Sequence, residues 1–336
     1  MINKTVLSLA TILILNTFSI SSAEPITSDT HQGNWYDDSV IYFKNNKSLN
    51  LDDYFNKFEP NKNIERKEII ALFKKVSDSI VNTEGYIFPE APFKDIPDDE
   101  NIKKSIDWAY DNLITNGIND NEFAPDNNLT REEAITFIYR LSKIFNLNLN
   151  DISKTIEFDD YDDSSSFAKK PIKWAIDKEI IKGYDNKIYP KNNITQAEIL
   201  QMTYNLFNKM NENKENNFSL SFERDDIQDI VLINSNFKKI KADKENLEEF
   251  LKEFEELKFS SVESRENTKA NTLIAEFIFK ESSNKLSYSF FESHINCGSY
   301  KYKISDESSK KLKSLIKKWD SLEGEDFEEN QGKLNK

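Results

Sequence analysis

Apolar residues recur at helical spacing directly after a capping signal near the middle of the chain. Thr130 and Glu133 stand three residues apart, which is the pattern of a capping box at the start of a helix. The apolar positions that follow are separated by four, three and four residues, at Ala134, Ile138, Leu141 and Phe145. This spacing places them on one face, so the sequence predicts a capped amphipathic helix over about residues 131–145.

This block of loop and helix occurs three times at a constant interval. Ile64, Leu129 and Ile194 are equally spaced along the sequence. Each copy has a proline before this position and a glutamate after it, in register: Pro60 and Glu68, Pro125 and Glu133, Pro190 and Glu198. A long constant period indicates stacked or symmetric copies of one supersecondary unit.

Each unit is predicted to contain a first helix, a loop and a capped second helix. We place the units at residues 35–85, 90–148 and 155–210. The first is degenerate, because its first helix, near residues 39–46, is short and poorly patterned. In the other two, Gly117 and Gly183 are expected to end the first helix as C-caps. Pro171 is expected to start the first helix of the third unit.

A different pattern begins after a polar linker at residues 211–217. Two strands, a helix, three strands and a last helix are predicted, in the order ββαβββα, which makes a small α+β domain over residues 218–320. Four aromatic residues alternate along two of the strands and predict packing beneath the two helices; an exposed ligand-binding face is the alternative. They are Tyr288, Phe290, Tyr300 and Tyr302. Residues 321–336 are expected to be a charged tail.

The N-terminal residues 1–23 are predicted to be a secretory signal peptide, with a lysine, an apolar core and a small-residue cleavage site. A retained membrane anchor is the alternative, and the short, interrupted apolar run disfavours it. No other segment is apolar enough to span a bilayer. The single cysteine, Cys297, permits no intramolecular disulfide. A net charge of −14 disfavours nucleic acid and anionic lipid as partners.

The motifs of the second and third units resemble the S-layer homology (SLH) domain. Phe93-x-Asp95 and Phe158-x-Asp160 are each followed by Trp-Ala, a glycine and a segment of the form Phe-x-Pro-x-Asn-Asn-Leu-Thr-Arg-x-Glu. In the third unit this segment has Ile for the Phe, Ile for the Leu and Gln for the Arg. The resemblance implies three repeats in an all-α pseudo-threefold bundle. It also implies non-covalent anchoring of a secreted, S-layer-associated protein to the secondary cell-wall polysaccharide of a Gram-positive bacterium, often a pyruvylated one.

The resemblance directs attention to seven candidate glycan-binding residues. Arg131 stands at the first position of a helix, where free N–H groups and the helix dipole favour an anion, and its guanidinium fits a carboxylate in two bonds. We expect Arg131, Arg66 and Gln196 to face solvent, and the best groove to centre on Arg131, because Glu65 opposes an anion beside Arg66. Trp108 and Trp174 could stack on a sugar or belong to the core. Gly117 and Gly183 would admit a ligand closely or only cap helices.

Catalytic chemistry finds little support in the sequence. The chain has two histidines, His31 and His294, and lacks the common hydrolase, metalloprotease, phosphate-loop and dinucleotide motifs. The acidic run at residues 159–163 lacks the order of a calcium loop and is expected to be solvated. We therefore expect no catalytic residue, metal or cofactor, and a non-enzymatic surface protein whose C-terminal partner is unassigned. The alternative is a wall hydrolase or processing enzyme anchored by the same repeats.

Overall fold

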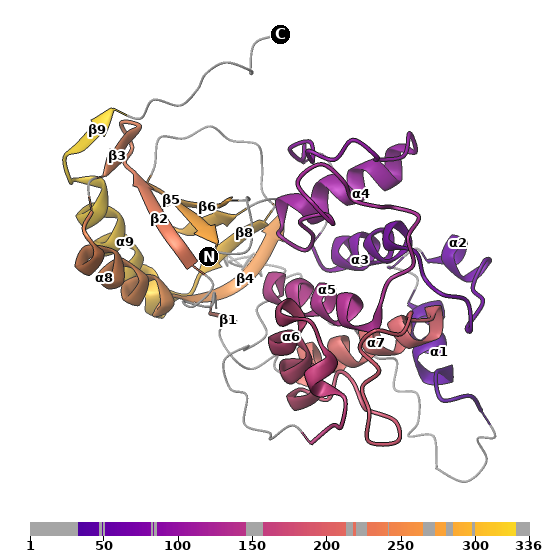
Figure 1. Ribbon diagram of the computed structural model, residues 1–336. Helices are drawn as coiled ribbons and strands as arrows, with labels where there is room; N and C mark the ends of the chain where they lie inside the picture. Colours follow the sequence, from indigo (N-terminus) through magenta and orange to yellow (C-terminus); the bar gives the residue numbers. More distant parts are fainter. Residues whose placement is uncertain are drawn as a thin grey trace, which may run out of the picture.

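A computed structural model describes the protein at residues 33–46, 49, 51–81, 83, 86–145, 157–212, 218–219, 227–240, 242–264, 273–279, 285–297 and 300–326. A helical region is followed by a region built on a β-sheet (Figure 1). The predicted signal peptide, residues 213–217 of the predicted linker and residues 327–336 lie outside the described part of the chain.

The helical region consists of three successive units, and each ends in a long second helix. The second helices begin at equal intervals along the sequence, as α3 (Arg66–Ile80), α5 (Arg131–Ile144) and α7 (Gln196–Glu212). The shorter helices are α1 (Asp37–Asn45), α2 (Asp52–Phe55), α4 (Glu100–Asp111) and α6 (Ser166–Asp177). The predicted helix over residues 131–145 and its capping box are thereby confirmed.

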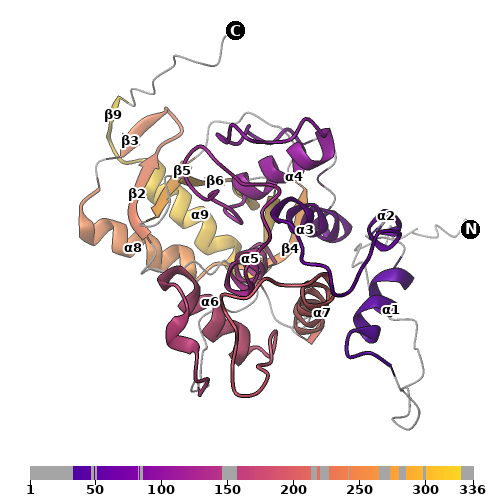
Figure 2. The ribbon, with the colours of Figure 1, turned by 45° about the vertical axis from the view of Figure 1, so that its right-hand side comes forward.

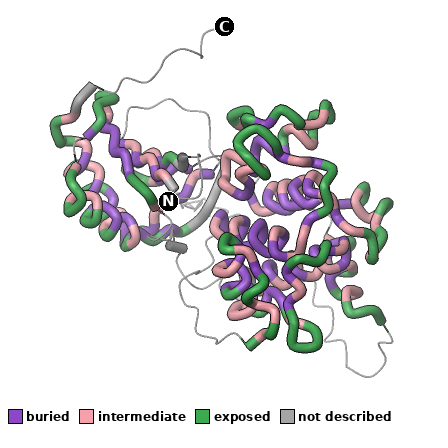
Figure 3. Tube along the Cα trace, viewed as in Figure 1, coloured by how far each residue is buried: buried purple, intermediate pink, exposed green. Residues whose placement is uncertain are grey.

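The second helix of each unit packs against the first helix of another unit. The pairs are α3 with α4, α5 with α6, and α7 with α1 (Figure 2). Buried residues run along α3 and α5 in the interior of this region, whereas the outer loops are exposed (Figure 3). No unit buries its apolar faces alone, which is the physical reason for the repetition.

The three units meet through a closed ring of backbone hydrogen bonds. Leu129 N–H donates to the Ile64 carbonyl at 3.1 Å, Ile194 N–H to the Leu129 carbonyl at 3.0 Å, and Ile64 N–H to the Ile194 carbonyl at 3.1 Å. All three side chains are fully buried. The residues that define the period in the sequence therefore lie at the junction of the units.

Among the described residues, the C-terminal strands form one antiparallel sheet in the order β1-β4-β8-β7-β6-β5-β2-β3-β9. The helices α8 (Lys244–Glu255) and α9 (Asp306–Asp320) pack against it, with Phe250 and Phe254 of α8 contacting Phe290. The strands are β1 (Phe218–Ser219), β2 (Ile227–Ile233), β3 (Lys238–Ile240), β4 (Lys258–Ser264), β5 (Leu273–Phe279), β6 (Lys285–Phe290), β7 (His294–Cys297), β8 (Tyr300–Ile304) and β9 (Gly324–Asp326).

The predicted order ββαβββα is incomplete, because it lacks β3, β4, β7 and β9. β3 and β9 have only three residues each, too few to show alternation. β4 is rich in serine and directly follows α8, and β7 is separated from β6 by a short turn. The predicted charged tail at 321–336 begins instead with β9, which pairs with β3.

Three predicted helix boundaries are also wrong. α6 begins at Ser166 and contains Pro171, so the proline does not start the helix. α4 and α6 end at Asp111 and Asp177, well before Gly117 and Gly183. Both glycines therefore lie in the following loops and are not C-caps.

Candidate functional site

The N-termini of the three second helices are covered by carbonyls from another unit. Arg131 N–H donates to the Asn192 carbonyl at 2.8 Å, and Glu132 N–H to the Pro190 carbonyl at 3.0 Å. The equivalent backbone bonds occur at the other two helix starts. In α3 the N–H groups of Arg66 and Lys67 donate to the carbonyls of Asn127 and Pro125. In α7 the N–H groups of Gln196 and Ala197 donate to the carbonyls of Lys62 and Pro60. The N–H groups that were expected to attract an anion are therefore occupied, so the helix-terminus argument does not hold.

Arg66 is a contact between units 1 and 2, and the prediction that it faces solvent is wrong. Its side chain is 4% exposed, Nε donates to the Phe123 carbonyl at 2.9 Å, and Nη1 pairs with Glu133 at 3.0 Å. The guanidinium also lies over the rings of Phe123 and Phe137, at 5.1 and 5.3 Å. Burial lowers the pKa of Arg66, and the nearby carboxylates oppose that shift.

Arg131 takes the corresponding place between units 2 and 3, but its hydrogen bonds are less complete. Nη1 pairs with Glu198 at 2.9 Å, and Nη2 reaches the Lys182 carbonyl only at 3.4 Å. Nε is buried and has no hydrogen-bond partner in the described part of the chain. The side chain is 13% exposed, and burial lowers its pKa against the opposing effect of Glu198. Arg131 is thus also mostly buried. Its Nε makes no hydrogen bond within the described residues, whereas Nε of Arg66 donates to the Phe123 carbonyl.

Gln196 occupies the third corresponding position without a charge. Its side-chain oxygen accepts a hydrogen bond from Glu59 N–H at 3.0 Å, and the residue is 3% exposed. The expectation that Gln196 faces solvent is therefore wrong as well. Its described contact joins unit 3 to the loop of unit 1.

The remaining four candidates are two buried tryptophans and two half-buried loop glycines. Trp108 and Trp174 are fully buried and belong to the core, so neither indole is available to stack on a sugar. A Cβ on Gly117 would overlap the ring of Phe93, and one on Gly183 would overlap the ring of Phe158. These glycines allow the phenylalanines of the Phe-x-Asp motifs to approach the chain closely.

The aspartates of these motifs have a role that the sequence did not reveal. The two carboxylate oxygens of Asp95 accept from Phe123 N–H and Ala124 N–H, at 2.8 and 2.7 Å. Asp160 accepts in the same way from Ile188 and Tyr189, also at 2.8 and 2.7 Å. Asp160 therefore orders a loop rather than only being solvated. The recurrence of Phe-x-Asp at the same position of two units was the sequence signal that could have revealed this role.

The loop that Arg131 contacts carries an exposed tyrosine. Tyr184 is 79% exposed and follows Lys182, whose carbonyl accepts from Arg131, by two residues. A tight turn fixes its backbone, because Tyr184 N–H donates to the Lys187 carbonyl at 2.9 Å. In unit 2 the corresponding residue is Ile118, which is 52% exposed. An exposed aromatic residue in the same loop that an incompletely bonded arginine contacts makes this the strongest candidate surface for a ligand.

Metal-binding and membrane-spanning features are absent from the described residues. No group of three or more His, Cys, Asp or Glu side chains there is arranged to hold a metal ion. None of the described helices is long and apolar enough to cross a membrane. Cys297, in β7, is buried and forms no disulfide within the described part of the chain.

Comparison with known families identifies the class of the two well-patterned units. Residues 92–135 and 157–200 match the family model of the S-layer homology domain. Both segments are thus similar to the S-layer homology domain, a class of domain that mediates cell-wall anchoring.

Two curated relatives share this part of the chain. An amylopullulanase of Thermoanaerobacterium thermosulfurigenes is 26% identical over 153 residues, which are 45% of this chain and 8% of the relative. The exoglucanase XynX of Acetivibrio thermocellus is 26% identical over 155 residues, which are 46% of this chain and 14% of the relative. The chain thus spans only a small part of the length of these relatives.

Proposed function

We propose that this protein is a secreted surface protein whose three helical units hold it non-covalently to a cell-wall polysaccharide of a Gram-positive bacterium. The observation that carries the proposal is the match of units 2 and 3 to the S-layer homology domain. The predicted signal peptide is consistent with export of the chain.

Unit 1 is proposed to be a third, diverged repeat of a pseudo-threefold bundle. Its Ile64 takes the same part in the central backbone ring as Leu129 and Ile194. Its Arg66 pairs with Glu133 of unit 2, as Arg131 of unit 2 pairs with Glu198 of unit 3. These equivalent contacts support common descent of the three units, although the sequence of unit 1 has lost the tryptophan and the glycine.

The ligand is proposed to be a wall polysaccharide that carries a carboxylate, such as a pyruvyl ketal. Arg131 would supply the positive charge, since its side chain is 13% exposed and Nη2 makes only a long hydrogen bond, of 3.4 Å, to the Lys182 carbonyl. Tyr184 replaces the two buried tryptophans as the ring available for stacking on the sugar. Arg66 and Gln196 would act mainly as contacts between units.

We propose that the protein is not an enzyme. The named activities of the two relatives do not transfer, because the shared segments cover 45% and 46% of this chain and 8% and 14% of the relatives. The sheet region would then be the part displayed at the wall, with a partner that its chemistry does not identify.

The substitution Tyr184→Ala is expected to weaken binding of a pyruvylated wall-polysaccharide fragment about tenfold, because one stacking ring is lost. Tyr184 is 79% exposed, so the thermal melt should not change. The measurement is calorimetric titration of the full chain, with Ile118→Ala as the matched control in the other loop. Equal affinities for wild type, Tyr184→Ala and Ile118→Ala would exclude Tyr184 from the binding surface.

A further inference from the structure

In two of the three helix pairs, a tyrosine at the same position of the second helix packs against an aromatic ring of the first helix. Tyr139 of α5 packs edge-on against Trp174 of α6, with ring centroids 5.3 Å apart. Tyr204 of α7 holds the equivalent position one repeat later and packs edge-on against Tyr42 of α1, at 5.1 Å. In each pair the tyrosine of one unit thus covers an aromatic residue of another.

The third pair, α3 with α4, has a lysine at this position. Lys74 stands one repeat before Tyr139 and directs its amino group to Asp78 and to the Thr83 hydroxyl, the latter at 3.0 Å. The same amino group lies 5.4 Å from the ring centre of Phe88. Lys74 is therefore engaged away from Trp108, the buried indole of α4.

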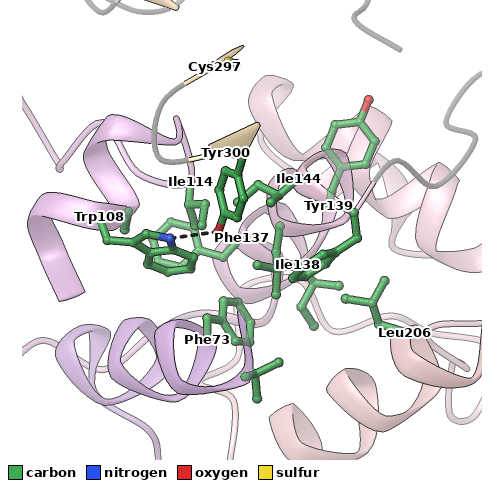
Figure 4. Close-up of a cluster of buried hydrophobic side chains, with 14 of the residues drawn as sticks. Phe73, Trp108, Ile114, Phe137, Ile138, Tyr139, Ile144, Leu206, Cys297 and Tyr300 are labelled. Carbon is green, nitrogen blue, oxygen red and sulfur yellow. Dashed lines mark hydrogen bonds between the residues drawn. The ribbon is translucent and has the colours of Figure 1, made fainter. Parts of the chain in front are cut away.

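A tyrosine from the C-terminal sheet reaches this pair instead. The hydroxyl of Tyr300, on β8, lies 2.6 Å from the Ser77 hydroxyl of α3 and accepts from Trp108 Nε1 of α4 at 3.1 Å (Figure 4). Tyr300 is 1% exposed, although it lies outside the helical region in sequence. These bonds join residues separated by 223 and 192 positions.

The register of the sheet explains how Tyr300 becomes available. Tyr288 pairs with Cys297, and Cys297 pairs with Tyr300, so the three side chains share one face of the sheet. Phe254 of α8 covers Tyr288 on this face, with ring centroids 5.1 Å apart. Tyr300 lies two strands farther across the sheet and enters the helical region. The α3–α4 pair thus covers the same face of the sheet as α8, at the strand that carries Tyr300.

We propose that the C-terminal sheet docks permanently on the α3–α4 pair and supplies, through Tyr300, the tyrosine that this pair lacks. The α3–α4 pair and the C-terminal sheet then stabilise each other, and the repeats and the C-terminal domain keep a fixed mutual orientation. The interaction surface comprises Ser77, Trp108 and Tyr300, and its partner is the chain itself. The α3–α4 pair is consequently closed to other ligands, in contrast to the surface beside Arg131.

Hydrogen exchange measured segment by segment on the full chain tests this proposal. Tyr300→Ala should accelerate exchange at least tenfold in α3 and α4 as well as in β8. Tyr204→Ala is the matched control, because it removes a tyrosine from within the helical region; it should accelerate exchange in α7 and α1 and leave β8 unchanged. Faster exchange confined to the sheet in Tyr300→Ala would overturn the proposal.

Two further variants keep the test decisive if Tyr300→Ala folds poorly. Tyr300→Phe retains the ring and loses both hydroxyl bonds, so α3, α4 and β8 should all exchange faster, by a smaller factor than in Tyr300→Ala. Adding Lys74→Tyr to Tyr300→Ala restores the tyrosine of the other pairs, so protection should return in α3 and α4 but not in β8. Unchanged exchange in α3 and α4 for Tyr300→Phe would contradict docking through Tyr300. So would a double variant in which protection returns in β8 together with α3 and α4.

Discussion

Replacing Arg66 by methionine is expected to lower the free energy of unfolding by about 3 kcal/mol, at the lower end of the range for breaking a buried ion pair. The substitution leaves Glu133 without its cationic partner at the boundary of units 1 and 2, and it removes the donor to the Phe123 carbonyl. The lower end applies because the Glu133 side chain is 27% exposed and can be partly hydrated. Urea unfolding of the full chain measures the effect.

Lys67→Met is the matched control for Arg66→Met. Lys67 is the next residue of α3, and its amino group pairs at the surface with Glu65 and Asp126. An exposed pair of this kind contributes less than about 1 kcal/mol. If Arg66→Met were no more destabilising than Lys67→Met, the contact of Arg66 with unit 2 would not hold the units together.

Gly117→Ala is expected to lower the free energy of unfolding by about 3 kcal/mol, from left-handed backbone strain and overpacking together. Gly117 has φ +76°, and an added Cβ would lie 2.5 Å from both the Phe93 ring and the Glu122 carbonyl oxygen. Neither neighbour can move away easily, since the ring is buried and the oxygen belongs to the backbone. A denaturant titration of the variant gives the value.

Gly33→Ala provides the comparison for Gly117→Ala. An added Cβ there would meet the carboxylate of Asp37, the end of a flexible side chain. We expect a change within about 0.5 kcal/mol, as for other surface substitutions. A small effect at Gly117 would mean that the glycine is not required by the packing of Phe93, and would return it to the candidates for ligand contact.

The long second helices of the three units could be predicted because their signals are local. Thr130 and Glu133 mark a helix start within one turn, and the structure places α5 at Arg131–Ile144. The short strands β3 and β9 could not be found, since they exist through pairing with each other and not through their own pattern. The glycine C-caps were wrong because a residue at φ 55°, Leu113, follows the end of α4 without a glycine.

The candidate site was harder to predict, because its contacts join residues of different units that lie far apart in the sequence. The sequence places Arg66 and Arg131 at helix starts, but it does not show that Glu133 and Glu198 lie opposite them. It also cannot tell that the loop carbonyls of another unit occupy the N–H groups of these helices. Tyr184 was missed because exposure is a property of the folded loop.

Cosedimentation of the full chain with purified cell-wall sacculi tests the proposed anchoring most directly. Intact sacculi and sacculi chemically stripped of their secondary polysaccharide are compared at equal mass. We predict that the protein sediments with the intact sacculi and remains in solution with the stripped ones. Equal sedimentation with both, or with neither, would contradict anchoring through the polysaccharide.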